Sequence, residues 1–311
     1  MATIQSKGIF LTLVAQLDKL ARHNRQGSFR TKARYYEAMK RFCAYLADEY
    51  RLQKLSNING KHFVSYVLYL QDAGKAASTI KTDLSAIRFF HDKMDSKYTL
   101  PSNDNLGIEL ELRRFGQFDR TWSGPEFNRL LGKAMAENRD DFILALYLGR
   151  YAGLRIHECF RIDTAAAERA LRENALTVKG KCGKVRTVPI EDERILMMLR
   201  KLLARTERGH KLLVPDDVPT DRAINALELF IYRYRNGISD EGSDRRLTFH
   251  GLRHTFAVAS IKSGDDIKTV QESLGHATAA FTLDVYGHVT KQMKQDSAVR
   301  MEQFIKSVSG V

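Results

Sequence analysis

The first hundred residues carry apolar side chains at helical spacing, and this pattern restricts the fold more than any other feature of the sequence. Between residues 31 and 50, apolar positions recur every three or four residues, at Tyr36, Met39, Cys43, Leu46 and Tyr50. The segment 76–94 repeats the pattern, and 1–20 and 60–73 carry shorter versions of it. An α-helix places residues three or four apart on one face, so each segment predicts an amphipathic helix. We therefore expect a small all-helical domain.

The chain is long enough for a second domain, because 311 residues correspond to about two domains of ~150 residues. Helical periodicity fades between 99 and 121, where turn-forming residues are frequent. It resumes at Ser123, which can form a capping box with Glu126, with Pro125 in the first helical turn. These patterns predict a helical domain at 1–100, a linker at 101–121 and a second domain at 122–311.

The second domain is predicted to combine helices with one β-hairpin. Two short β-branched runs, 175–179 and 184–190, lie on either side of the turn sequence Gly-Lys-Cys-Gly. The remaining segments have helical patterns, and Gly264 and Gly275 are placed to end two of these helices. The predicted fold class is mostly α with a small β-sheet, an all-α domain followed by an α+β domain.

The charge of the chain indicates a polyanionic partner. The formal net charge is +13, and the first hundred residues hold 17 basic and 8 acidic side chains. A basic first third on a less basic remainder favours a module that binds nucleic acid, although a solvated basic surface would have the same composition. No apolar run approaches the ~18 residues of a membrane span, so no membrane partner is expected.

The cysteines indicate a reducing compartment. Cys43, Cys159 and Cys182 are odd in number and far apart, and no Cys-x-x-Cys pair is present. This usage argues against both a disulfide framework and a structural zinc site.

Four short segments of the second domain concentrate residues that suit chemistry. They are 152–158, the hairpin turn 179–186, 250–254, and 274–286. Each has an ordinary structural explanation; for example, Arg155 and Glu158 could form a surface ion pair, and the hairpin could be a basic turn. His250 and His254 have the spacing of zinc ligands on a helix, but the cation of Arg253 between them opposes a metal. We therefore expect no metal site.

Taken together and in this order, the four segments resemble the tyrosine recombinase, or phage integrase, family. The strings that carry the resemblance are Ala-Gly-Leu-Arg-Ile-His-Glu, Gly-Lys-x-Gly-Lys-x-Arg-x-Val-Pro, His-Gly-Leu-Arg-His-Thr, and Leu-Gly-His followed by Thr-Leu-Asp-Val-Tyr-Gly-His-Val. Residues 77–91 also look like the last helix of the family's N-terminal domain. The resemblance implies a core-type DNA-binding domain at 1–100, a catalytic domain at 122–311, and an interaction helix at 289–308 that relatives donate to a neighbouring protomer.

The resemblance implies that five residues bind or support the scissile phosphate. Arg155 and Arg253 would hold the phosphoryl oxygens, since a guanidinium is always charged and binds two oxygens at once. His250 would assist proton transfer beside them, and His276 would donate a further hydrogen bond to the phosphate. Glu158 is expected to support Arg155 rather than to react, because a carboxylate facing the phosphate would repel it.

The resemblance also implies a nucleophile and a general acid. Tyr286 would attack phosphorus and conserve the bond energy in a 3′-phosphotyrosine linkage. Lys181 would protonate the 5′ oxygen, with Lys179 and Lys184 as rivals because strand alternation places Lys179 and Lys181 on the same face. Cys182 departs from the glycine that is commonest after this lysine.

The implied reaction is site-specific recombination through a Holliday junction, with no cofactor, metal or ATP. The implied partners are double-stranded DNA at paired recombination sites and three further copies of the chain in a tetramer on DNA; a directionality factor is left open. Lys81 and Arg88 are candidates for the DNA face of the first domain, although both could be merely solvated. His157, where relatives often have serine, has no interpretation from the sequence.

Two alternatives to recombination stay open at this stage. A type IB topoisomerase shares the catalytic set but does not exchange strands, and a relative that has lost catalysis would only bind DNA. In each case the expected place of action is the cytoplasm of a prokaryote, at the nucleoid.

Overall fold

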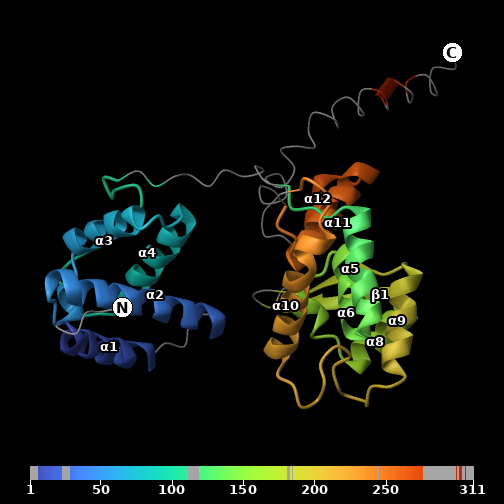
Figure 1. Cartoon of the computed structure of the whole chain (residues 1–311), viewed down its shortest axis with the longest axis horizontal. Coiled ribbons are helices and arrows are strands. Elements are labelled where there is room, and N and C mark those ends of the chain that lie inside the picture. Colours follow the sequence, from blue (N-terminus) through green and yellow to red (C-terminus); the bar gives the residue numbers. More distant parts are fainter. Residues whose placement is uncertain are drawn as a thin grey trace. The chain divides into compact units, whose positions relative to one another are not determined.

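The computed structural model describes residues 6–22, 29–108, 110, 119–180, 183, 185–243, 245–275, 299, 301–302 and 305. The chain divides into two compact units, residues 1–114 and 115–311, each with its own hydrophobic core (Figure 1). The predicted fold class, mostly α with a small sheet, is confirmed. Among the described residues, no helix has the length and apolar character needed to cross a membrane.

The N-terminal unit contains the four helices that the apolar spacing predicts. They are α1 (Lys7–Arg22), α2 (Phe29–Tyr50), α3 (Gly60–Asp72) and α4 (Ala77–His91), with a short 3₁₀ turn at Leu55–Asn57. Asn59 fixes the start of α3, because its side chain accepts hydrogen bonds from the backbone N–H groups of Lys61 and His62. The apolar faces meet in a core whose largest fully buried side chains include Tyr66, Phe42, Phe63 and Phe90.

The predicted linker at 101–121 does not behave as a spacer along its whole length. Leu106 is 4% exposed and belongs to the core of the N-terminal unit, and Ile108 and Leu110 pack against that core. At the other end, Trp122 is 2% exposed in the core of the second unit. Apolar residues among the turn formers thus extend the N-terminal unit into the predicted linker, and the core of the second unit begins directly after it.

The C-terminal unit is built around α6 (Asp140–Tyr151). Eight consecutive residues of this helix, 142–149, are buried, and it packs against α5 (Gly124–Ala136), α9 (Glu193–Leu203) and α11 (Phe249–Ser263). Gly149 permits the approach of α11, because a Cβ there would lie 2.9 Å from the ring of Phe249. The other helices are α7 (Ile156–Cys159), α8 (Thr164–Glu173), α10 (Thr220–Ile238) and α12 (Ile267–Leu274).

The helix boundaries of this unit follow local signals in the sequence. The capping box at Ser123 and Glu126 is present at the start of α5. Thr248 caps α11, and Gly264 and Gly275 end α11 and α12 in the left-handed conformation that glycine favours.

The predicted hairpin is present as β1 (Ala175–Lys179) and β2 (Val185–Pro189). The strands are antiparallel, with Val178 opposite Arg186 and Leu176 opposite Val188. They form a two-stranded sheet that packs against α8 through β1 and against α12 through β2.

Candidate active site

A glycine turn between α6 and α7 places Arg155 at the start of α7. Gly153 has a φ of +61°, and a Cβ on it would lie 2.6 Å from the ring of Phe256. Both the backbone conformation and the space therefore require glycine here. Arg155 follows in extended conformation as the N-cap residue of α7, with its side chain 25% exposed.

Glu158 lies beneath Arg155 and is completely buried. Its Oε1 accepts from Nη1 of Arg155 at 3.0 Å and from Nη1 of Arg186 at 2.8 Å. Its Oε2 accepts from the Arg155 backbone N–H at 2.9 Å and from Nη2 of Arg186 at 2.8 Å. Burial by itself would raise the pKa of this carboxyl, but these hydrogen bonds and the arginine charges outweigh it and lower the pKa to about 2. Glu158 is thus a fixed anion that orients two guanidiniums.

Arg253 reaches the same region from α11 and is 2% exposed. Its Nη1 donates to the Gly153 carbonyl at 2.6 Å, and its Nη2 donates to the Leu274 carbonyl. Nη2 of Arg155 donates to the next carbonyl, that of Gly275, at 3.4 Å. Two guanidiniums are therefore held against consecutive carbonyls at the end of α12. Arg155, Arg186 and Arg253 carry three positive charges beside the single negative charge of Glu158, so the cluster keeps an excess of positive charge.

His250 lies one turn before Arg253 on α11, and its imidazole is neutral at pH 7. The residue is exposed to solvent, but desolvation by the surrounding protein is the largest cause of its lowered pKa of about 4, followed by the charges of Arg253, Arg155 and Arg120. Its ring meets the ring of His254 edge to face, with 4.6 Å between centroids. Within the described part of the chain, no three His, Cys, Asp or Glu side chains are grouped as metal ligands would be.

The segment before α5 holds the first two turns of α11 in place. The Trp122 indole N–H donates to the Thr248 carbonyl at 2.9 Å, and the Trp122 backbone N–H donates to the Thr255 hydroxyl at 2.8 Å. Gly251 permits this contact, since a Cβ there would lie 2.5 Å from the Arg120 carbonyl oxygen. These contacts fix the helix that carries His250.

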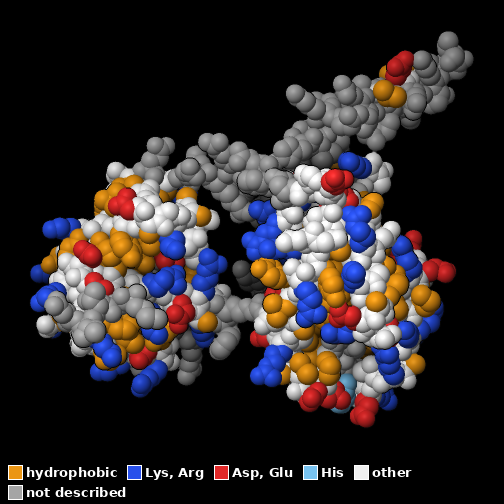
Figure 2. All heavy atoms as spheres, in the orientation of Figure 1, with side chains coloured by type: hydrophobic (Ala, Val, Ile, Leu, Met, Phe, Trp, Pro, Cys, Tyr) orange, Lys and Arg blue, Asp and Glu red, His pale blue; other side chains and the backbone are white. Residues whose placement is uncertain are grey.

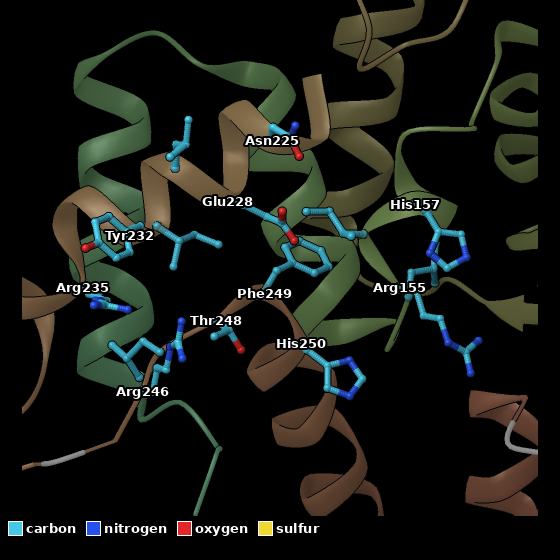
Figure 3. A pocket seen from close by; sticks show the side chains of 15 residues that line it. Arg155, His157, Asn225, Glu228, Tyr232, Arg235, Arg246, Thr248, Phe249 and His250 are labelled. Atoms are coloured by element: carbon cyan, nitrogen blue, oxygen red, sulfur yellow. The ribbon is translucent and has the colours of Figure 1, made fainter. Parts of the chain in front are cut away.

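A cavity of about 750 Å³ opens beside this cluster (Figure 3). Arg155, His157 and His250 line one part of it, and α10 lines another with its exposed Leu229 and Tyr232. Figure 3 shows the side chains of Arg155 and His250 extending from α7 and α11 on the same side of the cavity. The volume lies within the range of ~300–1,000 Å³ typical of ligand sites.

Several predicted site residues lie outside the described residues. They are Lys181, Lys184, His276 and Tyr286, together with Cys182 and most of the predicted interaction helix at 289–308. Lys179, the rival of Lys181, lies on β1 and is exposed. The structure thus brings together Arg155, Glu158, His250 and Arg253 from two separate segments, 152–158 and 250–254, and the roles of the remaining residues stay predictions.

Of the two candidates for a DNA face on α4, Arg88 has contacts within its own unit. Its Nε and Nη2 donate to the Pro101 carbonyl at 2.9 and 2.6 Å, and its Nη1 donates to Asn103 at 2.9 Å. The guanidinium also lies over the ring of Phe63. Arg88 therefore holds the 101–103 turn onto α4, which uses three of its five N–H donors. Lys81 is half-buried on the same helix.

The sequence analysis did not single out Arg186, which provides two of the hydrogen bonds to Glu158. The signal was present in the strand alternation. Val188 is buried, and a side chain two positions earlier on a strand points to the same face. A charged residue on the buried face requires a partner, and Glu158, already expected to support Arg155, was the acid of the neighbouring motif.

The comparisons with known proteins agree with this geometry. Residues 126–293, more than half of the chain, match the phage integrase family, and 16–94 match the phage integrase N-terminal SAM-like domain. The tyrosine recombinase XerD of Oceanobacillus iheyensis is 27% identical over 275 residues, which cover 86% of this chain and 90% of that protein. The tyrosine recombinase XerC of Herpetosiphon aurantiacus is 28% identical over 302 residues, covering 88% of each chain.

Two solved structures share the fold. The site-specific recombinase XerH, in a post-cleavage complex with a palindromic difH substrate, has a TM-score of 0.64 at 19% identity, covering 93% of this chain and 85% of that one. The integrase of the transposon Tn1549, bound to transposon right end DNA, has a TM-score of 0.65 at 16% identity, covering 93% and 99%.

Proposed function

Because this chain belongs to the phage integrase family and is a tyrosine recombinase, an enzyme that cleaves and rejoins DNA at specific sites, we propose that Arg155, Arg253 and His250 bind the scissile phosphate. The observation that carries this assignment is the pair of guanidiniums held on consecutive carbonyls at the end of α12, within range of His250. The XerD and XerC relatives favour site-specific recombination as the function of this chain. They do not favour the two alternatives, a type IB topoisomerase and a DNA-binding protein that has lost catalysis.

The charge balance of the cluster suits a phosphoryl transition state. Arg186 and Glu158 form a bidentate pair, so their charges cancel and Arg155 and Arg253 remain as two cations. A phosphodiester carries one negative charge, and its pentacoordinate transition state carries two when the nucleophile has lost its proton. Preorganised cations act most strongly where charge develops, so this excess favours the transition state over the ground state.

The remaining steps use residues assigned from the sequence. The Tyr286 oxygen forms a bond to phosphorus while the bond from phosphorus to the 5′ oxygen breaks. His250, neutral before the reaction, accepts the tyrosine proton, and Lys181 gives a proton to the departing 5′ oxygen. His276 donates a hydrogen bond to a phosphoryl oxygen. The reverse sequence rejoins a strand, so the cycle needs no ATP.

DNA is the macromolecular partner of this activity, and XerH and the Tn1549 integrase were both solved on their DNA sites. We assign the basic N-terminal unit to phosphate contacts, and Figure 2 shows lysine and arginine side chains on both units. Lys81, Lys179 and Lys184 are further candidates for such contacts. The active assembly is proposed to be a tetramer on paired sites, with the 289–308 helix exchanged between protomers, in the cytoplasm at the nucleoid.

Covalent trapping tests this function. Nicked duplexes that tile the DNA flanking the gene are incubated without metal or ATP with wild type and with Tyr286→Phe. A band that resists SDS, disappears with protease and forms only with wild type is the expected result. Binding of a duplex by both proteins without any adduct would contradict the catalytic assignment.

A further inference from the structure

Arg246 lies on the short segment that leads into α11, next to an arginine whose environment is the opposite of its own. The side chain of Arg245 is 20% exposed and is paired with three acids, Glu126, Asp240 and Asp119. Arg246 is exposed, and no acid of the described residues forms an ion pair with it. The charge of Arg245 is therefore cancelled inside the unit, whereas the charge of Arg246 reaches the surface without an acidic partner.

The backbone on both sides of Arg246 is held by the unit. On one side, Arg245 is anchored by its acids. On the other side, Leu247 is 2% exposed in the core, and Thr248 caps α11. A side chain on a fixed backbone loses less conformational entropy on binding a ligand than one on a loose loop. Arg246 is therefore presented to solvent from a prepared position.

Arg246 lines the same cavity as Arg155 and His250, and in the view of Figure 3 His250 lies between the two arginines. Arg246 precedes His250 by four positions, and four residues span at most ~14 Å. Phosphates recur every ~3.4 Å along the axis on each strand of DNA. A phosphate bound by Arg155 and His250 would thus have neighbouring phosphates within reach of Arg246.

The opposite wall of the cavity suits a DNA strand better than a small anion. Leu229 and Tyr232 of α10 line this wall and are 63% and 60% exposed. Sugars and bases have apolar faces that such side chains can contact, and an inorganic anion has none. Glu228 lines the same wall, and its negative charge would repel a phosphate. Phosphate contacts are therefore expected on the side of Arg246, with sugars and bases towards α10.

We propose that Arg246 binds a DNA phosphate near the scissile one, so that the duplex is held at two points of this cavity. The inference rests on the proposed phosphate site of Arg155, Arg253 and His250. A guanidinium can donate two parallel hydrogen bonds to phosphate oxygens, which fixes the direction of the strand as well as its position. Arg246 takes no part in bond breakage; it helps to determine which phosphate reaches Arg155.

The test compares binding phosphate by phosphate with the full-length chain. A duplex that wild type binds is prepared with a single uncharged methylphosphonate at each phosphate of the bound site in turn. Tyr286→Phe serves as the parent so that no strand is cut, and Arg246→Gln is added to it. At the phosphate that Arg246 contacts, the replacement should weaken binding by the parent about 10-fold and binding by the Arg246→Gln chain less than about 3-fold, because the same hydrogen bond cannot be lost twice.

The salt dependence of binding gives a second readout. One phosphate contact contributes about 0.9 to the slope of log K against log salt, so Arg246→Gln should reduce the slope by about that amount. Arg246→Lys keeps the charge and should restore most of the slope. Arg233→Gln is the matched control, because Arg233 is 66% exposed on α10, lies 3.9 Å from Glu137 and is not among the described residues that line the cavity. It should leave the slope and the methylphosphonate profile unchanged.

The outcomes distinguish this inference from the proposed function. A profile and slope of Arg246→Gln that match the parent would overturn the inference, since Arg246 would then be a solvated cation. A contact more than about four phosphates from the adduct would overturn it too, because Arg246 cannot span that distance from His250. The covalent adduct of wild type tests the catalytic assignment separately. If the adduct forms and Arg246→Gln changes nothing, only this inference fails; if the profile changes but no adduct forms, the catalytic assignment fails and the phosphate contact stands.

Discussion

Two glutamates of the C-terminal unit occupy the same position, three residues after the N-cap residue, in two helices, but they have different roles. Glu126 in α5 and Glu158 in α7 are both completely buried, and each accepts a hydrogen bond from the backbone N–H of its N-cap residue, at 2.8 and 2.9 Å. The N-cap residue is Ser123 in the first case, and its hydroxyl accepts from the Glu126 N–H at 3.2 Å. It is Arg155 in the second case, and a guanidinium has no acceptor. The α7 start therefore gives up a cap bond to present a cation.

The balance of charge around the two glutamates also differs. Arg245 beside Glu126 also pairs with Asp240 and Asp119, and Asp240 pairs with Arg129 as well, so three acids face two arginines. Around Glu158 the arginines outnumber the acid, and the excess faces the region of His250. Where arginines outnumber the acid, positive charge remains that can bind an anionic ligand. Where acids outnumber the arginines, no positive charge remains for such a ligand. The comparison separates a structural cluster from a binding one.

The largest expected effect comes from removing the charge of Glu158. Glu158→Gln leaves Arg186 buried beside a neutral amide, so it should lower the free energy of unfolding by about 3–5 kcal/mol. It should also slow cleavage by about 10³-fold, because Arg155 loses its orientation. Urea unfolding and single-turnover cleavage measure the two effects. Glu126→Gln is the matched variant. If it lowers the cleavage rate as much as Glu158→Gln does for the same loss of unfolding free energy, the two clusters do not differ in function.

Arg155→Lys should reduce cleavage by about 10²–10³-fold, the usual effect of losing one oriented donor to a transition state. Its effect on unfolding should stay near 1 kcal/mol, since the side chain is partly exposed and Arg186 keeps Glu158 paired. Thermal unfolding beside the cleavage assay checks this. A stability loss as large as that of Glu158→Gln would make Arg155 a structural residue.

The lowered pKa of His250 predicts that the free energy of unfolding depends on pH. Its pKa in the folded chain is about 4, below the ~6.5 of an unfolded histidine. A lowered pKa stabilises the fold above about pH 6.5, and this contribution, reduced by solvent around the exposed ring, is lost as the pH falls to 4. His250→Gln should therefore lose less stability than wild type between pH 7 and pH 4. Urea titrations at both pH values measure the loss, and a loss of equal size in His250→Gln and wild type would contradict a lowered pKa of His250.

The smallest expected effect on cleavage comes from removing the N-cap hydroxyl of α5, that of Ser123. Ser123→Ala removes the hydroxyl that accepts from the Glu126 N–H and should lower stability by about 1 kcal/mol. Cleavage measured well below the unfolding temperature should stay within about two-fold of wild type, because α5 carries no group of the phosphate site. A large loss of cleavage would show that α5 couples to α11 through Trp122.

Local patterns in the sequence predicted most of the fold. Helical spacing located α2 and α4, β-branched runs located the hairpin, and Thr248 and Gly275 marked helix ends, because each signal lies within one element. The family resemblance is confirmed. Arg155, Glu158, His250 and Arg253 lie in one region, and their roles stay predictions. A surface ion pair between Arg155 and Glu158, the ordinary alternative, is wrong because Glu158 is buried.

Features that depend on contacts distant in sequence could not be predicted in this way. Arg186 reaches Glu158 across 28 positions and Ser273 across 87, and strand alternation indicates only that it needs a partner. Leu106 was predicted to lie in a linker because turn formers surround it, but it belongs to the core of the N-terminal unit, and Ile108 and Leu110 pack against that core. Arg88 was a candidate for the DNA face, with a solvated cation as the alternative, because its acceptors at Pro101 and Asn103 lie 13 and 15 positions away in the sequence.

The central claim is that Arg155 recognises negative charge at the scissile phosphate. Replacing one non-bridging oxygen by a methyl group gives a methylphosphonate, which has no charge, and its two diastereomers are tested separately. Wild type should cleave the phosphodiester at least about 10²-fold faster than either methylphosphonate, and Arg155→Ala should lose most of that preference. A preference that is unchanged in Arg155→Ala would mean that this guanidinium does not face the phosphate, and the account would be wrong.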